Sequence, residues 1–224
     1  MKQSAQPARR IVLVNPNTDE AMTRMMVAIA QEAATTGVHV EGVTALFGAP
    51  LITKPAALAR ARDAVLSIPK GTFDGAKGVL VSAFGDPGAN ELRSCLSVPV
   101  VGLAEASMCA AADLGRFSIA TTTPGLAQAI RQKAAEIGVA EELVSVRTTQ
   151  EDPATLMRDG KAVLQALESI IKEAIARDDI CSVIIGGGPL GLAARDLVQR
   201  IDIPVLEPIP IAIRSLIENR TLWR

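Results

Sequence analysis

The chain has 224 residues, a formal net charge of −1 and 49% hydrophobic residues. This length suits one large domain or two small ones, and the composition excludes a disordered chain and one drawn to nucleic acid by its charge. Aromatic residues make up 2%, which argues against base stacking, and no run approaches the ~18 apolar residues of a membrane span. We therefore expect a cytoplasmic protein with a small-molecule ligand and neither a nucleic-acid nor a membrane partner.

Short β-rich runs alternate with amphipathic helical segments along the chain. The strands are expected at residues 11–15, 39–46, 78–84, 98–104, 117–122, 142–148, 181–187 and 203–208. The longer helices are expected at 19–36, 55–68, 124–138, 154–179 and 208–220. This alternation predicts an α/β fold in which parallel sheets are flanked by helices.

A weak internal repeat suggests two similar halves. The first strand ends in "NPNT" and a later one in "FGDPG", while "TTTPG" and "GGGPLG" end strands of the second part at a comparable separation. The sequence therefore predicts two pseudo-symmetric α/β subdomains with a ligand cleft between them. We assign residues 1–103 and 208–224 to the first subdomain and 104–207 to the second.

These four loops are the first candidates for a binding site, because ligands of open parallel sheets bind beyond the carboxyl ends of the strands. Each loop precedes a helix, and Thr18 and Thr123 stand at positions typical of N-caps. Free N–H groups and a positive dipole end would then face the cleft. The loops favour a carboxylate or a polarised carbonyl as ligand.

Two other kinds of site have weaker signals. Gly186, Gly188 and Gly191 fit the dinucleotide pattern G-x-G-x-x-G, but Pro189 interrupts the loop and too little chain follows Glu207 for a second nucleotide-binding half. The cysteines at 95, 109 and 181 lack metal-ligand spacing and suit reduced thiols. We expect no cofactor and no metal.

Several motifs together resemble the aspartate/glutamate/hydantoin racemase superfamily, and within it the hydantoin and allantoin racemases. They are "VNPNT" at 14–18, "FGDPG" at 84–88, "PVVGLAEAS" at 99–107, "FSIATTTP" at 117–124 and "PVLEPI" at 204–209. They follow the family order over nearly the whole chain. The resemblance implies two α/β subdomains with the substrate between them, and a homo-oligomer.

The resemblance also implies two catalytic cysteines, which this chain lacks. In the family one cysteine immediately precedes "FGDPG" and the other lies in a "G-C-A-G" loop, so that two thiols face opposite sides of the substrate's α-carbon. Here the corresponding residues are Ala83 and Gly187. An engineered Cys-to-Ala exchange would explain only Ala83, because the loop around Gly187 differs from relatives at several positions.

Two functions remain open on this basis. The first is an enzyme that acts on a small carboxylate, a cyclic ureide or an amide by chemistry that does not use cysteines. It would be an isomerase, or a lyase or decarboxylase with a single base. Its candidate acid/base groups are Asp86 and Glu105. The second is a catalytically inactive homologue that still binds the small molecule. The resemblance assigns substrate binding to Asn15, Asn17, Thr18, Ala83, Phe84, Gly85, Thr121, Thr122, Gly187 and Gly188.

Overall fold

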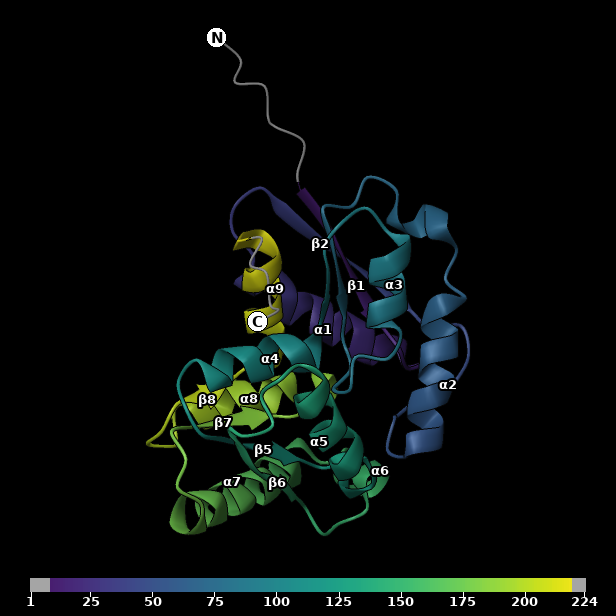
Figure 1. Ribbon diagram of the computed structural model, residues 1–224. Helices are drawn as coiled ribbons and strands as arrows, with labels where there is room; N and C mark the ends of the chain where they lie inside the picture. Colours follow the sequence, from purple (N-terminus) through teal and green to yellow (C-terminus); the bar gives the residue numbers. More distant parts are fainter. Residues whose placement is uncertain (1–8, 219–224) are drawn as a thin grey trace.

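Two four-stranded parallel sheets form the framework of the protein in the computed structural model, which describes residues 9–218 (Figure 1). In order across the first sheet lie β2 (Val38–Thr44), β1 (Arg9–Asn15), β3 (Gly78–Val81) and β4 (Val100–Gly102). The second sheet contains β6 (Leu143–Thr148), β5 (Phe117–Thr121), β7 (Ser182–Ile185) and β8 (Val205–Leu206). The two sheets therefore have the same topology: β6, β5, β7 and β8 correspond to β2, β1, β3 and β4.

This repeat confirms the expected α/β fold with two pseudo-symmetric halves. The boundary between the subdomains at residue 103 stays a prediction. The parts of the first subdomain at residues 1–8 and 219–224, including the end of the helix expected at 208–220, lie outside the described residues.

Helices connect the strands in chain order. The helices before β5 are α1 (Glu20–Ala33), α2 (Pro55–Leu66), the 3-10 turn η1 (Lys70–Phe73), α3 (Ala89–Cys95) and α4 (Leu103–Ala112). The later ones are η2 (Pro124–Leu126), α5 (Ala127–Glu136), α6 (Pro153–Leu156), α7 (Gly160–Arg177), η3 (Gly188–Leu190), α8 (Gly191–Val198) and α9 (Pro208–Glu218). Local signals explain several starts: the Asp19 side chain accepts a hydrogen bond from the Met22 N–H at the start of α1, and Pro55 opens α2.

The single helix expected over residues 154–179 is wrong, because the structure divides this segment into α6 and α7. Asp159 lies between them in an extended conformation, and its side chain accepts hydrogen bonds from the N–H groups of Lys161 and Ala162. An aspartate in this position satisfies backbone donors at a new helix start and therefore competes with continuation of the preceding helix.

The central strands β1, β3, β5 and β7 are buried on both faces over most of their length, so their side chains supply separate cores. Along β1, Ile11 and Leu13 belong to a cluster that also includes residues of the second half, whereas Val12 and Val14 belong to a cluster of the first half alone. Alternation of side chains along a strand produces this division. The result is one shared core and one core on the far face of each sheet.

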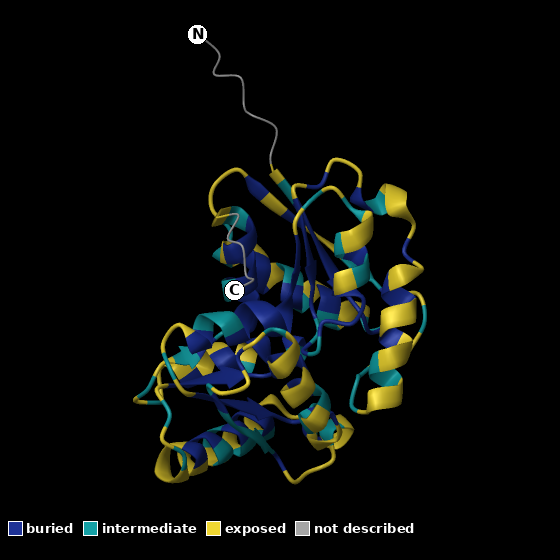
Figure 2. Ribbon diagram, in the orientation of Figure 1, coloured by how far each residue is buried: buried dark blue, intermediate teal, exposed yellow. Residues whose placement is uncertain are grey.

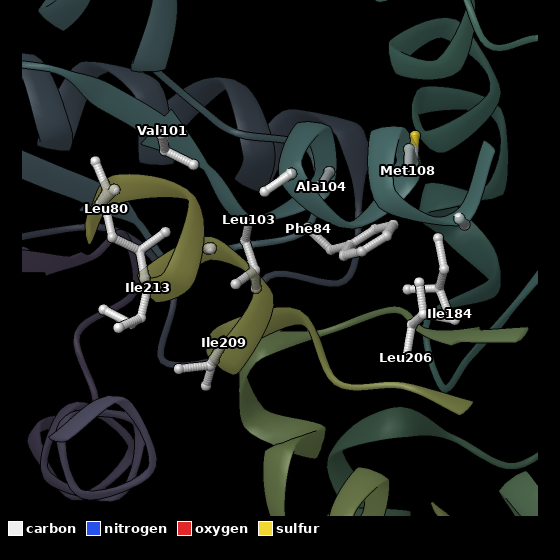
Figure 3. Close-up of a cluster of buried hydrophobic side chains, with 14 of the residues drawn as sticks. Leu80, Phe84, Val101, Leu103, Ala104, Met108, Ile184, Leu206, Ile209 and Ile213 are labelled. Carbon is white, nitrogen blue, oxygen red and sulfur yellow. The ribbon is translucent and has the colours of Figure 1, made fainter. Parts of the chain in front are cut away.

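The shared core joins the two halves through α4 and α9. Figure 1 shows both helices at the junction, and Figure 2 shows that α4 is largely buried there. The close-up in Figure 3 places Leu103 of α4 near Ile209 and Ile213 of α9, in a cluster that extends from Leu80 of β3 to Ile184 of β7. This packing holds the carboxyl ends of the two sheets in one site.

Candidate functional site

A cavity lies at the carboxyl ends of the central strands of both sheets. Its walls come from the loops after β1, β3, β5 and β7, together with a fifth loop after β2 and residues near α6. The lining residues are Asn17, Leu51, Ile52, Ser82, Ala83, Phe84, Thr121, Thr122, Thr123, Leu126, Met157, Gly186, Gly187, Gly188, Pro189 and Leu190. The cavity occupies the place that open parallel sheets use for ligands.

The loop after β1 is held by a buried amide network. The Asn15 side chain donates to Oδ1 of Asn17 at 2.8 Å and to Oγ1 of Thr23 at 2.9 Å, and its own oxygen accepts from the Asn17 N–H. Oδ1 of Asn17 also accepts from the Asp19 N–H. Asn15 therefore positions the loop and Asn17 reaches the cavity. Thr18 donates its N–H to the Ala49 carbonyl and does not line the cavity.

The loop after β3 brings Ala83 and Phe84 to the cavity. Their backbone N–H groups donate to no acceptor among residues 9–218, so both remain available to a ligand. Ser82 also lines the cavity, but its hydroxyl lies 3.2 Å from Sδ of Met26 on α1. Gly85, with a φ of 125°, packs against Leu58 outside the lining.

Asp86 turns away from the cavity and holds the start of α4. It has a φ of 52°, and its two carboxylate oxygens accept hydrogen bonds from the N–H groups of Ala104 at 2.7 Å and Glu105 at 2.9 Å. Burial and the neighbouring Glu105 raise the pKa of Asp86 to about 7, while the two N–H donors favour the charged form. The carboxylate of Asp86 is not part of the cavity lining.

Glu105 lies on α4 and is likewise outside the lining. Its carboxylate accepts from Nη2 of Arg93 at 2.6 Å and from the Gly102 N–H at 2.8 Å. Burial raises the pKa of Glu105, and the two donors oppose that shift. Asp86 and Glu105 thus form a buried polar cluster with Arg93 behind the cavity wall.

The second half contributes hydroxyl and backbone groups. Oγ1 of Thr121 and Oγ1 of Thr123 lie 3.0 Å apart, whereas the Thr122 hydroxyl has no hydrogen bond to any described residue. The N–H groups of Thr122 and Thr123 also have no acceptor within the described chain. Thr122 is 3% exposed and lines the cavity, and its hydroxyl is not among the fully buried unpartnered side-chain atoms of the described residues, so water or a polar ligand group can reach it.

Apolar side chains form the rest of the cavity, and most of them were missed by sequence reasoning. The missed lining residues are Leu51, Ile52, Ser82, Thr123, Leu126, Met157, Gly186, Pro189 and Leu190. The motif "TTTPG" contained Thr123, and the Gly-x-Pro turn before Leu51 was the one signal for the loop after β2. Met157 follows the short helix α6, for which no motif stood in the sequence.

The structure brings together most of the predicted binding residues. Asn17, Ala83, Phe84, Thr121, Thr122, Gly187 and Gly188 line the cavity, and Asn15, Thr18, Gly85, Asp86 and Glu105 do not. The described lining contains no aspartate, glutamate, histidine, cysteine, lysine or arginine. The cavity can therefore donate hydrogen bonds, but none of its described side chains can act as a general acid or base near neutral pH.

Other sites are also absent from the part of the chain that the structure describes. Within residues 9–218, no group of three or more His, Cys, Asp or Glu side chains is placed to hold a metal ion. Over the same range, no helix has both the length and the apolar character needed to cross a membrane.

Comparison with known proteins agrees with this geometry. The family model for Asp/Glu/Hydantoin racemase matches residues 11–216. A hydantoin racemase of Pseudomonas sp. (strain NS671) is 27% identical over 213 residues, which cover 92% of this chain and 83% of that protein.

Two solved structures are similar over a comparable share of the chain. Allantoin racemase from Klebsiella pneumoniae has a TM-score of 0.86 at 29% identity, with 93% of this chain and 86% of that chain covered. Allantoin racemase from Pseudomonas fluorescens has a TM-score of 0.88 at 26% identity, with 93% and 89% covered.

Proposed function

Since this chain belongs to the Asp/Glu/hydantoin racemase family, we propose that it binds a small cyclic ureide of the hydantoin or allantoin class in the cavity between its two halves. The proposal follows the ligands in the names of similar proteins, which are hydantoin and allantoin racemases. One observation carries it further: the described cavity lining combines unpartnered hydrogen-bond donors with no titratable side chain. We propose binding without two-thiol racemisation.

The donors of the cavity suit the carbonyl groups of such a ligand. The N–H groups of Ala83 and Phe84 come from the first half, and those of Thr122 and Thr123 come from the second. A cyclic ureide carries two carbonyl acceptors on one small ring, so donors from both halves can be used at once. Leu126, Met157 and Leu190 offer an apolar surface to a ring substituent.

Thr122→Val tests the binding role of the cavity. Removal of the unpartnered hydroxyl should weaken binding of hydantoin or allantoin about tenfold, which is the upper part of the range for one neutral hydrogen bond. The free energy of unfolding should stay the same, because the protein itself makes no hydrogen bond to this hydroxyl within the described residues. Isothermal titration calorimetry gives the affinity and urea denaturation gives the stability.

Thr36→Val is a matched control, since Thr36 is exposed beyond the end of α1. It should leave both quantities unchanged. If the wild-type protein binds neither hydantoin nor allantoin at millimolar concentration, the proposed ligand class is wrong.

A second candidate is an enzyme that uses Asp86 as a single acid/base, with isomerase or lyase chemistry. The observation that favours it is the pKa of Asp86, which burial and Glu105 raise to about 7, near the pH at which a general base operates best. In this case a motion of the loop after β3 would have to release the carboxylate from the N–H groups of Ala104 and Glu105.

Asp86→Asn separates the two candidates in deuterated water. If Asp86 is the base, the wild-type protein should exchange the α-proton of a chiral hydantoin faster as the pH rises through about 7, because only the charged carboxylate accepts a proton. The variant should then lose this exchange by at least a hundredfold. NMR follows the α-proton signal, and an absence of exchange together with measurable binding supports the inactive homologue.

A further inference from the structure

The loop after β2, residues 45–54, forms one wall of the cavity. Leu51 and Ile52 lie in it and line the cavity. It follows β2 and precedes α2 without regular secondary structure. The repeated sheet topology alone does not determine where such a connection lies.

Contacts with the first half hold the two ends of this loop. Near its start, the Ala45 N–H donates to the Asn15 carbonyl, and the Ala49 carbonyl accepts from the Thr18 N–H. After its end, Leu58 of α2 packs against Gly85, at 3.2 Å from the place that a Cβ atom of residue 85 would occupy. Both ends are therefore fixed to the subdomain that carries β1 and β3.

The middle of the loop is held only by packing. Residues 50–53 make no backbone hydrogen bond with any residue in the range 9–218. Ile52 packs on the shared core, and the Thr53 carbonyl lies against Gly125 of the second half. Figure 1 shows the start of α2 on the same side of the molecule as α5 and α6. The contact between Thr53 and Gly125 thus closes the wall against the other half.

This contact requires glycine at position 125. A Cβ atom on Gly125 would lie 2.6 Å from the Thr53 oxygen, whereas real Cβ atoms keep at least 3.0 Å from their neighbours. The backbone of Gly125 has no positive φ, so an alanine is otherwise acceptable there. The hydrogen at this position allows the two backbones to approach, and a methyl group would require the Thr53 carbonyl and residue 125 to separate by about 0.4 Å or more.

We propose that Gly125 is a specificity-determining residue that acts through the loop of residues 45–54. It lets Leu51 and Ile52 lie close over the cavity and so limits the size of the ring substituent that a bound ligand can carry. The proposal rests on the proposed function for the nature of the ligand. Its structural part, the position of the loop, does not depend on any ligand.

Gly125→Ala tests the effect on specificity with two probes, 5-methylhydantoin and 5-benzylhydantoin. The methyl moves the wall outward, so the variant should bind the smaller probe more weakly and the larger one more tightly. We expect the ratio of the two dissociation constants to change about tenfold in favour of the benzyl compound. Gly160→Ala is the matched control, because a Cβ at Gly160 meets nothing within 4 Å. An unchanged ratio in Gly125→Ala overturns the proposal.

A second measurement needs no ligand. Ile52→Cys places a thiol on the loop, and its alkylation rate by iodoacetamide, read by peptide mass spectrometry, should rise at least threefold when Gly125→Ala is added. If Ile52→Cys is alkylated at the same rate with and without Gly125→Ala, the proposal is overturned, even if neither hydantoin binds. If Gly125→Ala raises the alkylation rate but neither hydantoin binds, only the ligand class is wrong. If Gly125→Ala does not fold, Ile52→Ala should shift the ratio of dissociation constants in the same direction, and an unchanged ratio there also overturns the proposal.

Discussion

Gly102→Ala should lower the free energy of unfolding by about 3 kcal/mol or more. A Cβ atom at residue 102 would lie 2.2 Å from Cγ and 2.5 Å from Oδ2 of Asp86. The carboxylate cannot move away without losing its hydrogen bonds to the N–H groups of Ala104 and Glu105. Urea denaturation followed by circular dichroism measures the loss.

The double variant Asp86→Gly with Gly102→Ala identifies the cause. Glycine suits the φ of 52° at residue 86 and removes the three atoms nearest to the new methyl, all of which belong to the Asp86 side chain. It also removes the two hydrogen bonds to α4, so Asp86→Gly alone should cost about 2 kcal/mol. If the overlap is responsible, the double variant should be more stable than Gly102→Ala. If the double variant instead loses the sum of the unfolding free energies that the two single variants lose, the effect of Gly102→Ala has another cause.

Leu103→Ala should destabilise the protein by about 3 to 5 kcal/mol, because Leu103 is fully buried in the shared core and removal of its side chain leaves a cavity there. Since that core contains residues of both sheets, we expect the halves to unfold together. Denaturation should be followed by hydrogen exchange of β3 and β7, because each strand belongs to a different sheet.

Leu114→Ala is the matched control, since Leu114 is 52% exposed just beyond the end of α4. It should cost less than 1 kcal/mol. Both strands are compared in the Leu103→Ala variant at the same denaturant concentration. If β3 remains protected there while β7 exchanges freely, the two halves are separate folding units, and the shared core contributes less to the stability of the whole protein than we infer.

The fold and most of the binding loops could be predicted from the sequence, because their signals are local. Buried strands read as short apolar runs, and the loops that follow them carry Gly, Pro, Asn and Thr. Asn17, Ala83 and Thr122 were placed in the cavity by this reasoning together with the family motifs. Each of them lies within three residues of the end of a strand.

The role of Asp86 could not be predicted in this way, because its partners are distant in the sequence. The N–H groups that donate hydrogen bonds to its carboxylate belong to Ala104 and Glu105, and the intervening chain forms α3 and β4. The residue at the N-cap of α4 is Gly102, which has no side chain to cap the helix. Asp86 supplies part of that missing function from another loop. Leu51, Ile52 and Met157 were missed for a related reason, since the wall they form depends on how the two halves pack.

The repeated strand order has a consequence for how a flat ligand would be treated. Ala83 and Gly187 each lie two residues beyond corresponding strands, β3 and β7, and differ by one methyl group. The backbone donors at the two positions are unequal, because the Gly187 N–H donates to the Ile185 carbonyl whereas the Ala83 N–H has no acceptor among residues 9–218. The connections after β2 and β6 are unequal, since residues 45–54 precede α2 and only residues 149–152 precede α6. A ligand held between Ala83 and Gly187 would therefore meet different surroundings on its two sides, both in backbone donors and in the length of the neighbouring loop.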